Sequence, residues 1–182
     1  QQSYADLVTA PLTKRFAQFS GATGGAVGVG LGVMFLLLKY IGKPVVTSSS
    51  EGGSTSSQIP QASIEATRFV NSSVQLSIYV LPLLAAAFAG VLGLYAAREL
   101  DANDREVYVA GAAGALVGAV VLVVVGAFLA SMAFGSVSAN GNTFVEKPGS
   151  VAFANLVMNA VAIGVGAAVL GAGSAWADRT QF

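Results

Sequence analysis

The sequence predicts an all-α integral membrane protein with four transmembrane helices, on the basis of its composition and of four long apolar stretches. Of the 182 residues, 54% are hydrophobic and 10% are charged, and the mean hydropathy is +0.71. Soluble domains carry about 25% charged residues, because their surface is solvated. This chain has too few charges to cover a domain in water, so much of its surface is expected to face lipid.

The four apolar stretches each supply the roughly 20 residues that a helix needs to cross a hydrocarbon core about 30 Å thick. They cover residues 20–42, 74–97, 107–134 and 151–177. None contains Asp, Glu or Arg, whereas strands of a membrane β-barrel would alternate apolar and polar residues. Together they are expected to form one transmembrane domain, residues 20–177, built as two helical hairpins.

The first 19 residues have a periodicity of their own, with apolar side chains at three- or four-residue spacings. The stripe consists of Tyr4, Leu7, Val8, Leu12, Phe16 and Phe19. Residues 1–19 are therefore predicted to form an interfacial amphipathic helix. The alternative is an extension of the first span into water, and Pro11 permits a break between the two. The segment has no apolar core of the kind found in a signal peptide.

The connection between the first two spans, residues 43–73, is rich in Ser, Thr and Gly. Such a composition cannot bury enough apolar surface to offset the entropy of ordering. A flexible loop is predicted here, which a partner could order. Its last part, Gln61 to Val70, lacks Pro and Gly and has helical spacing, so it is expected to extend the second span or to lie along the interface.

The other two connections are shorter. Residues 98–106 are charged and fit a tight turn between helices, with a polar residue capping the third helix. The capping candidates are Asp101, Asn103 and Asp104. Residues 135–150 contain Asn140-Gly141 between two short apolar stretches. That pair predicts a β-hairpin with a two-residue turn.

Four spans place both termini and the 98–106 connection on one side, and the two other connections on the opposite side. Basic residues near the span ends favour the cytoplasm. The first side holds five of them and the second side holds four. The five are Lys14, Arg15, Arg98, Arg105 and Arg179. The expected location is the plasma membrane with both termini in the cytoplasm.

Two pairs of short segments resemble each other within the chain. GATGGAVG at 21–28 matches GAAGALVG at 111–118, and AGVLG at 89–93 matches AAVLG at 167–171. The order of the matches is that of a tandem duplication of a helical hairpin, as in membrane proteins built from parallel repeats. The alternative is chance, because Gly, Ala and Val are abundant throughout.

Small residues spaced four apart are the strongest local signal, since they let helix backbones approach closely in lipid, as in the GxxxG pattern. Two asparagines in the fourth span, one turn apart, are expected to form interhelical hydrogen bonds, and the alternative is that they line a pore. The predicted helix-packing positions are Gly21, Gly25, Gly28, Gly32, Ala89, Gly93, Gly114, Gly118, Asn155 and Asn159.

Reactive groups are scarce. The chain has no Cys and no His, which removes the thiolate nucleophile, the usual general base and the commonest metal ligand. No catalytic, cofactor or metal site is predicted, so an enzyme is not expected. Net charge is zero, which gives no electrostatic reason to expect nucleic acid as a partner. The bias to Ala, Val and Gly resembles the composition of small membrane proteins from salt-adapted archaea, but without their acidic excess.

The sequence therefore predicts a non-enzymatic membrane protein. It is expected to be a structural or accessory subunit, held by small-residue helix faces in a homo-oligomer or to other membrane subunits, with lipid around it. The alternative is a passive channel or small transporter for an uncharged or weakly charged solute. No ionisable side chain lies deep in a span, so coupling to protons is not expected.

Overall fold

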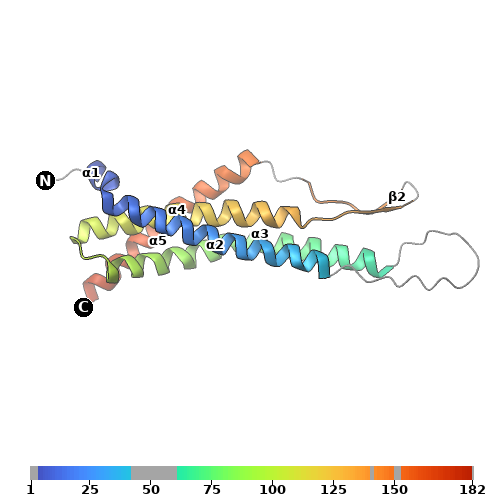
Figure 1. Ribbon diagram of the computed structural model, residues 1–182, viewed down its shortest axis with the longest axis horizontal. Helices are drawn as coiled ribbons and strands as arrows, with labels where there is room; N and C mark the ends of the chain where they lie inside the picture. The colour runs from blue at the N-terminus through green and yellow to red at the C-terminus, as the bar shows by residue number, and fades with distance from the viewer. Residues whose placement is uncertain (1–3, 42–60, 140–141, 150–152, 182) are drawn as a thin grey trace, which may run out of the picture.

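The computed structural model describes residues 4–41, 61–139, 142–149 and 153–181. Long helices lie side by side along one axis, and a small hairpin extends from one end (Figure 1). The elements in chain order are α1 Tyr4–Thr9, α2 Pro11–Ile41, α3 Gln61–Glu99, α4 Asp104–Met132, β1 Val137–Ala139, β2 Asn142–Val145 and α5 Phe153–Gln181.

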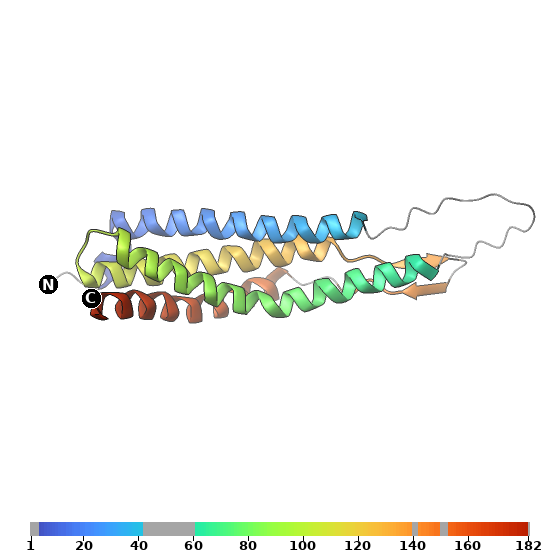
Figure 2. The same cartoon turned by 90° about the horizontal axis from the view of Figure 1, so that it is seen from below.

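Helices α2, α3, α4 and α5 are each long and apolar enough to cross a membrane, which confirms the four predicted spans. Both termini and the α3–α4 connection lie at one end, here called the terminal end (Figures 1 and 2). The β strands lie at the other, the hairpin end. This arrangement is that of an all-α multi-pass membrane protein.

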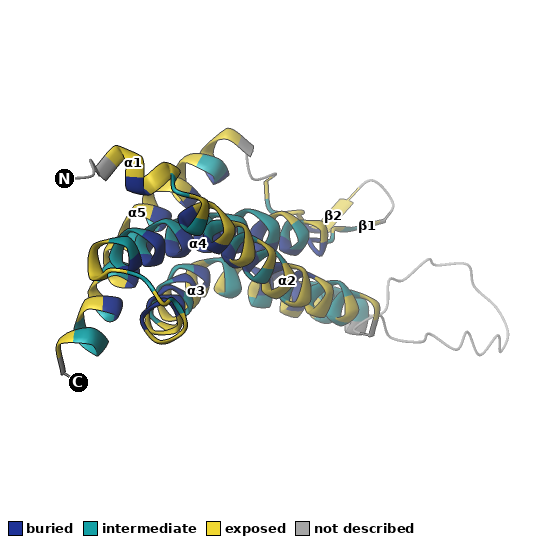
Figure 3. Cartoon of the chain, turned by 60° about the vertical axis from the view of Figure 1, so that its left-hand side comes forward, coloured by how far each residue is buried: buried dark blue, intermediate teal, exposed yellow. Residues whose placement is uncertain are grey.

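Helix α4 is the centre of the bundle. It packs against α2, α3 and α5, whereas α2 and α3 meet over few residues and the described parts of α2 and α5 do not touch. Buried positions follow α4 from Val107 to Ala130, and Figure 3 shows them facing the interior. The glycines of α2 approach α4 and not α3, so α2 and α3 do not pack along their length as a hairpin, whereas α4 and α5 do pack together.

The segments that resemble each other lie against each other. Gly24 in α2 approaches Gly118 in α4, and Gly93 in α3 approaches Gly171 in α5. A close crossing needs small residues on both helices. Packing by itself therefore accounts for the similarity, and duplication stays a prediction.

The N-terminal segment is divided. Helix α1 ends at Thr9, and Pro11 is the first residue of α2, a position where the missing N–H of proline costs no hydrogen bond. The buried hydroxyl of Thr13 donates to Leu7 O at 2.8 Å and joins the two helices. Residues 11–19 thus form the first turns of the first spanning helix and do not form a separate amphipathic helix with residues 4–9.

Helix α3 has 39 residues, about 58 Å at 1.5 Å per residue, which is far longer than a hydrocarbon core of about 30 Å. It begins at Gln61, so residues 61–70 continue the second span. The helix bends near its middle (Figure 2), and Pro82 lies inside it, where it cannot donate a helical hydrogen bond. Residues 42–60, most of the predicted flexible loop, lie outside the described residues.

The predicted β-hairpin is confirmed by antiparallel pairing of β1 with β2, in which Ala139 faces Asn142. The turn residues 140–141 lie outside the described residues. The side chain of Asn71 holds the start of this segment, because its Nδ2 donates to Gly135 O and its Oδ1 accepts from Gly135 N, both at 3.0 Å. This pair of bonds ties the chain after α4 to α3.

Candidate functional site

The α2–α4 interface consists of glycines on one side of α2. A methyl group placed on Gly28 would lie 3.0 Å from Leu122 O, and one on Gly24 would collide with Gly118 O. Gly32 lies against the side chain of Leu129 in the same way. The backbones of α2 and α4 are therefore in direct contact over much of their length, as small residues permit in lipid.

The α4 glycines receive large side chains from two neighbours. Phe16 and Ser20 of α2 lie against Gly114, where an added methyl group would be 2.5 Å from Phe16 Cδ1 and 2.7 Å from Ser20 Oγ. A methyl group placed on Gly118 would lie 2.8 Å from Cε1 of Phe88 in α3. The Ser20 hydroxyl is buried and is the one such side-chain oxygen without a hydrogen-bond partner within the described chain.

The α3–α5 crossing is equally close. A methyl group placed on Gly93 would collide with Gly171 O and Ser174 Oγ of α5. Ala89, one turn away on α3, is fully buried in the central apolar cluster. Gly21 and Gly25 of α2 pack less tightly. A methyl group placed on them would lie 3.1 Å from Val117 Cγ1 and 3.4 Å from Val121 Cγ1, respectively. The structure thus places every glycine of the predicted packing set at an interface within the chain.

The two asparagines are placed differently. Asn155 and Asn159 are both exposed on α5, and among the described residues neither side chain forms a hydrogen bond to another helix. The expectation that they form interhelical hydrogen bonds therefore stays a prediction, and the partner would have to be a helix of another chain. The same side of α5 carries Gly166 and Gly173, which have open space where a side chain would be. Sequence spacing placed the two amides on one face but could not show which way that face turns.

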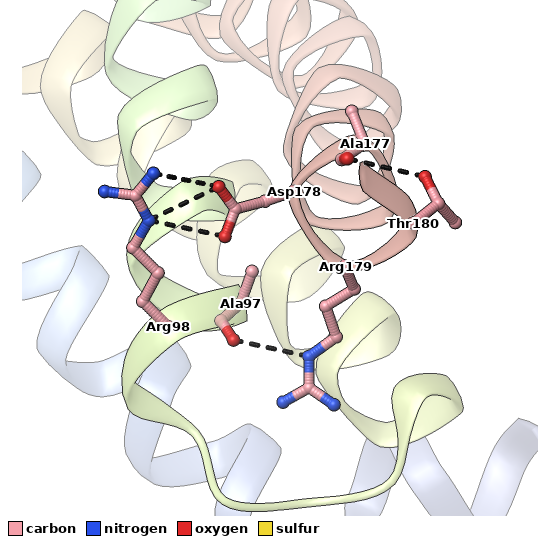
Figure 4. Close-up of polar contacts among 6 residues, drawn as sticks. All are labelled: Ala97, Arg98, Ala177, Asp178, Arg179 and Thr180. Atoms are coloured by element: carbon pink, nitrogen blue, oxygen red, sulfur yellow. Dashed lines mark hydrogen bonds and ion pairs between the residues drawn. The ribbon is translucent and has the colours of Figure 1, made fainter. Parts of the chain in front are cut away.

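Helix ends at the terminal end are joined by two arginines from different helices. Arg98 of α3 forms an ion pair with Asp178 of α5 at 2.9 Å, and its side chain is 67% exposed (Figure 4). Arg179 of α5 is only 23% exposed and pairs with Asp104 at 2.8 Å. Its guanidinium also donates to three backbone carbonyls, those of Ala97, Leu100 and Ala102, at 2.8 to 3.3 Å.

Arg179 therefore closes the C-terminal end of α3, where the last carbonyls of a helix have no partner inside the helix. Asn103 occupies the predicted cap position before α4, but its side chain makes no capping hydrogen bond. From the sequence, Arg179 was expected only as one of the basic residues near the span ends. The sequence carries no local signal for this role, because Arg179 lies at least 77 positions from the carbonyls to which it donates.

Comparisons with protein-family models, with curated proteins and with solved structures find no match. Along the part of the chain that the structure describes, no three Asp, Glu, His or Cys side chains lie close enough together to hold a metal ion. The described residues form close contacts between helices. The features that bear on function are therefore the exposed face of α5 and the polar groups at the two ends of the bundle.

Proposed function

We propose that this chain is a structural or accessory subunit of a membrane assembly, and that the exposed face of α5 is its contact surface. The observation behind this proposal is the common exposure of Asn155, Asn159, Gly166 and Gly173 on one side of a spanning helix. Ala162 lies between them and is exposed as well. These positions form a narrow stripe of small and polar residues, which is flanked on α5 by exposed large apolar side chains such as Met158 and Val169.

The position of the amides in the membrane supports a protein partner. Helix α5 has 29 residues, about 43 Å, so it exceeds a hydrocarbon core of about 30 Å by roughly 7 Å at each end when centred. Asn155 then lies among headgroups and Asn159 at the edge of the hydrocarbon. Water among the headgroups can satisfy the amide of Asn155, but the amide of Asn159 is costly at the hydrocarbon edge without a hydrogen-bond partner.

A second copy of the chain supplies such a partner. Copies in one membrane share an orientation, so a twofold axis along the membrane normal brings Asn159 to Asn159 at equal depth. An amide both donates and accepts, so two identical amides satisfy each other. The small side chains at Ala162, Gly166 and Gly173 allow the two backbones to approach. A different membrane subunit with a polar helix face would serve in the same way.

Cross-linking tests this contact directly, because the chain has no native cysteine. We expect Gly166→Cys to form disulfide-linked dimers when native membranes are oxidised. Val29→Cys on α2 and Val91→Cys on α3 serve as controls, since these side chains are 46% and 63% exposed on other faces. Equal cross-linking at all three positions, or a monomer without partners by native mass spectrometry in mild detergent, would contradict the proposal.

A second variant separates the contribution of the Asn159 amide to association from that of small-residue packing on α5. Asn159→Leu in the Gly166→Cys background is expected to lower the cross-linked fraction, since a membrane hydrogen bond contributes about 0.6 kcal/mol on average and up to about 1.7 kcal/mol. If the face meets only lipid, the leucine leaves the fraction unchanged. If a different subunit covers it, Gly166→Cys links to that subunit and not to itself.

The interior of the bundle favours a subunit over a passive channel. The buried polar side chains of the described residues are Thr13 and Ser20 near the terminal end and Asn71 near the hairpin end. Alanine, glycine, valine and leucine fill the region between them. A single chain packed in this way offers no row of polar groups for a solute to follow.

The orientation that we propose places both termini in the cytoplasm. Cysteines at Thr143 in β2 and at Asp101 in the α3–α4 connection test it, because both native residues are exposed. A membrane-impermeant thiol reagent applied to intact cells is expected to label the first position alone, and both after permeabilisation. Labelling of the Asp101 variant alone in intact cells would reverse the orientation.

A further inference from the structure

A cavity of about 420 Å³ opens at the hairpin end, between the last turn of α2, the first turns of α3 and the chain that follows α4. Two lysines, Lys39 and Lys147, line it together with the hydroxyl-bearing residues Ser63, Thr67 and Ser136. None of the described residues that line it is Asp or Glu. The cavity therefore combines two positive charges with several neutral polar groups.

Lys39 is held in place by the end of α4. Its ammonium donates to Met132 O at 2.8 Å and to Phe134 O at 3.3 Å, which satisfies two carbonyls at the C-terminus of that helix. An ammonium has three N–H donors, so one remains. Lys147 forms no ion pair within the described chain. Capping of α4 thus explains the position of Lys39. Within the described chain, neither Lys39 nor Lys147 has a carboxylate as counterion.

The cavity lies at the depth of lipid headgroups. Lys39 is in the last turn of α2, and Met132 is the last residue of α4, so two spanning helices end beside it. The part of α3 at this point, from Ser63 to Asn71, mixes polar and apolar residues, and α3 is far longer than the hydrocarbon core. Lysine side chains near helix ends reach the headgroup region in this way.

We infer that this cavity binds a phosphate group, with Lys39 and Lys147 as its charged donors. Lysine binds phosphate as a point charge. The hydroxyl of Ser136 adds a neutral hydrogen bond, whereas that of Thr67 already donates to Ser63 O. The depth of the cavity makes the headgroup of an anionic phospholipid the favoured source, and a soluble phosphate ester has the same chemistry. The inference is independent of the α5 contact, because the cavity lies on other elements.

The test compares lipids with and without net charge. Purified protein in mild detergent is titrated with phosphatidylglycerol or phosphatidylcholine of the same acyl chains and observed by native mass spectrometry. We expect one phosphatidylglycerol to bind more tightly than phosphatidylcholine, because the choline cation would meet two ammonium groups. Lys147→Gln is expected to weaken phosphatidylglycerol binding about tenfold, the effect of losing one charged hydrogen bond.

Arg68→Gln is the matched control, because Arg68 is an exposed cation on the same part of α3 that does not line the cavity. It is expected to leave the binding of phosphatidylglycerol unchanged. Lys39→Gln should weaken binding as well, but it also uncaps α4. Lys147→Gln is therefore the decisive variant. The native Lys147 side chain is exposed and forms no hydrogen bond or ion pair in the described chain.

A second arm separates the two sources of phosphate. Glycerol phosphate is added to lipid-free detergent samples, and the thermal unfolding midpoint is measured. A saturable rise that Lys147→Gln abolishes would assign the site to a soluble ester, whereas no rise together with selective lipid binding assigns it to a headgroup. Equal binding of both lipids without a rise, or equal weakening by Lys147→Gln and Arg68→Gln, overturns the inference.

Discussion

Gly93→Ala is expected to lower the free energy of unfolding by about 3 kcal/mol, although it adds a single methyl group. The methyl group would collide with Gly171 O and Ser174 Oγ on α5. A carbonyl of a neighbouring helix cannot rotate away as a flexible side chain can, so α3 and α5 must separate. Separation would also loosen the contact of both helices with α4, because all three pack together.

Gly90→Ala is the matched control for this loss. Gly90 lies on the same helix, one turn earlier, and has open space where a methyl group would be placed. Alanine favours a helix over glycine by up to about 1 kcal/mol, so this variant is expected to be as stable as the parent or slightly more stable. Gly24 and Gly30 form a second pair of the same kind on α2.

Reversible denaturation in one detergent measures both pairs. The expected order is Gly93→Ala and Gly24→Ala well below the parent, with Gly90→Ala and Gly30→Ala at or above it. Equal stability of Gly93→Ala and Gly90→Ala would show that α3 and α5 do not cross where the structure places them.

Arg179→Met is expected to cost about 3 kcal/mol of stability, because it removes the hydrogen bonds of a charged donor to backbone carbonyls around the end of α3. The ion pair with Asp104 adds little, since that carboxylate is 65% exposed. Methionine keeps the apolar stem and removes the guanidinium. The carbonyls of Ala97 and Ala102 then lose the guanidinium as donor, whereas Leu100 O keeps the hydrogen bond from Ala102 N. Arg179→Lys is expected to recover little, since one ammonium cannot reproduce the spread of a planar guanidinium.

Arg98→Met tests whether any arginine at this end has the same effect. Arg98 also pairs with a carboxylate, that of Asp178, but it is 67% exposed and donates to no backbone carbonyl in the described structure. Exposed ion pairs contribute little, so this variant is expected to unfold close to the parent. If Arg98→Met and Arg179→Met lose stability equally, the carbonyl contacts of Arg179 are not what stabilises the connection.

The sequence by itself determined the elements of the fold. Apolar length identified the four spanning helices, since a hydrocarbon core sets the number of residues that a helix needs. The pair Asn140-Gly141 marked the hairpin, whose two strands pair as predicted. These signals are local, and each follows from a few consecutive residues and the solvent around them.

Only the tertiary structure decided which faces meet. A soluble helix reveals its buried side by contrast with polar residues, but the outside of a membrane helix is as apolar as its interior. For this reason the sequence could not show that α4 is central, that Gly24 meets Gly118, or that Asn155 and Asn159 turn outward. The carbonyl contacts of Arg179 and Lys39 join residues at least 75 positions apart, so they exist only once the helices have packed.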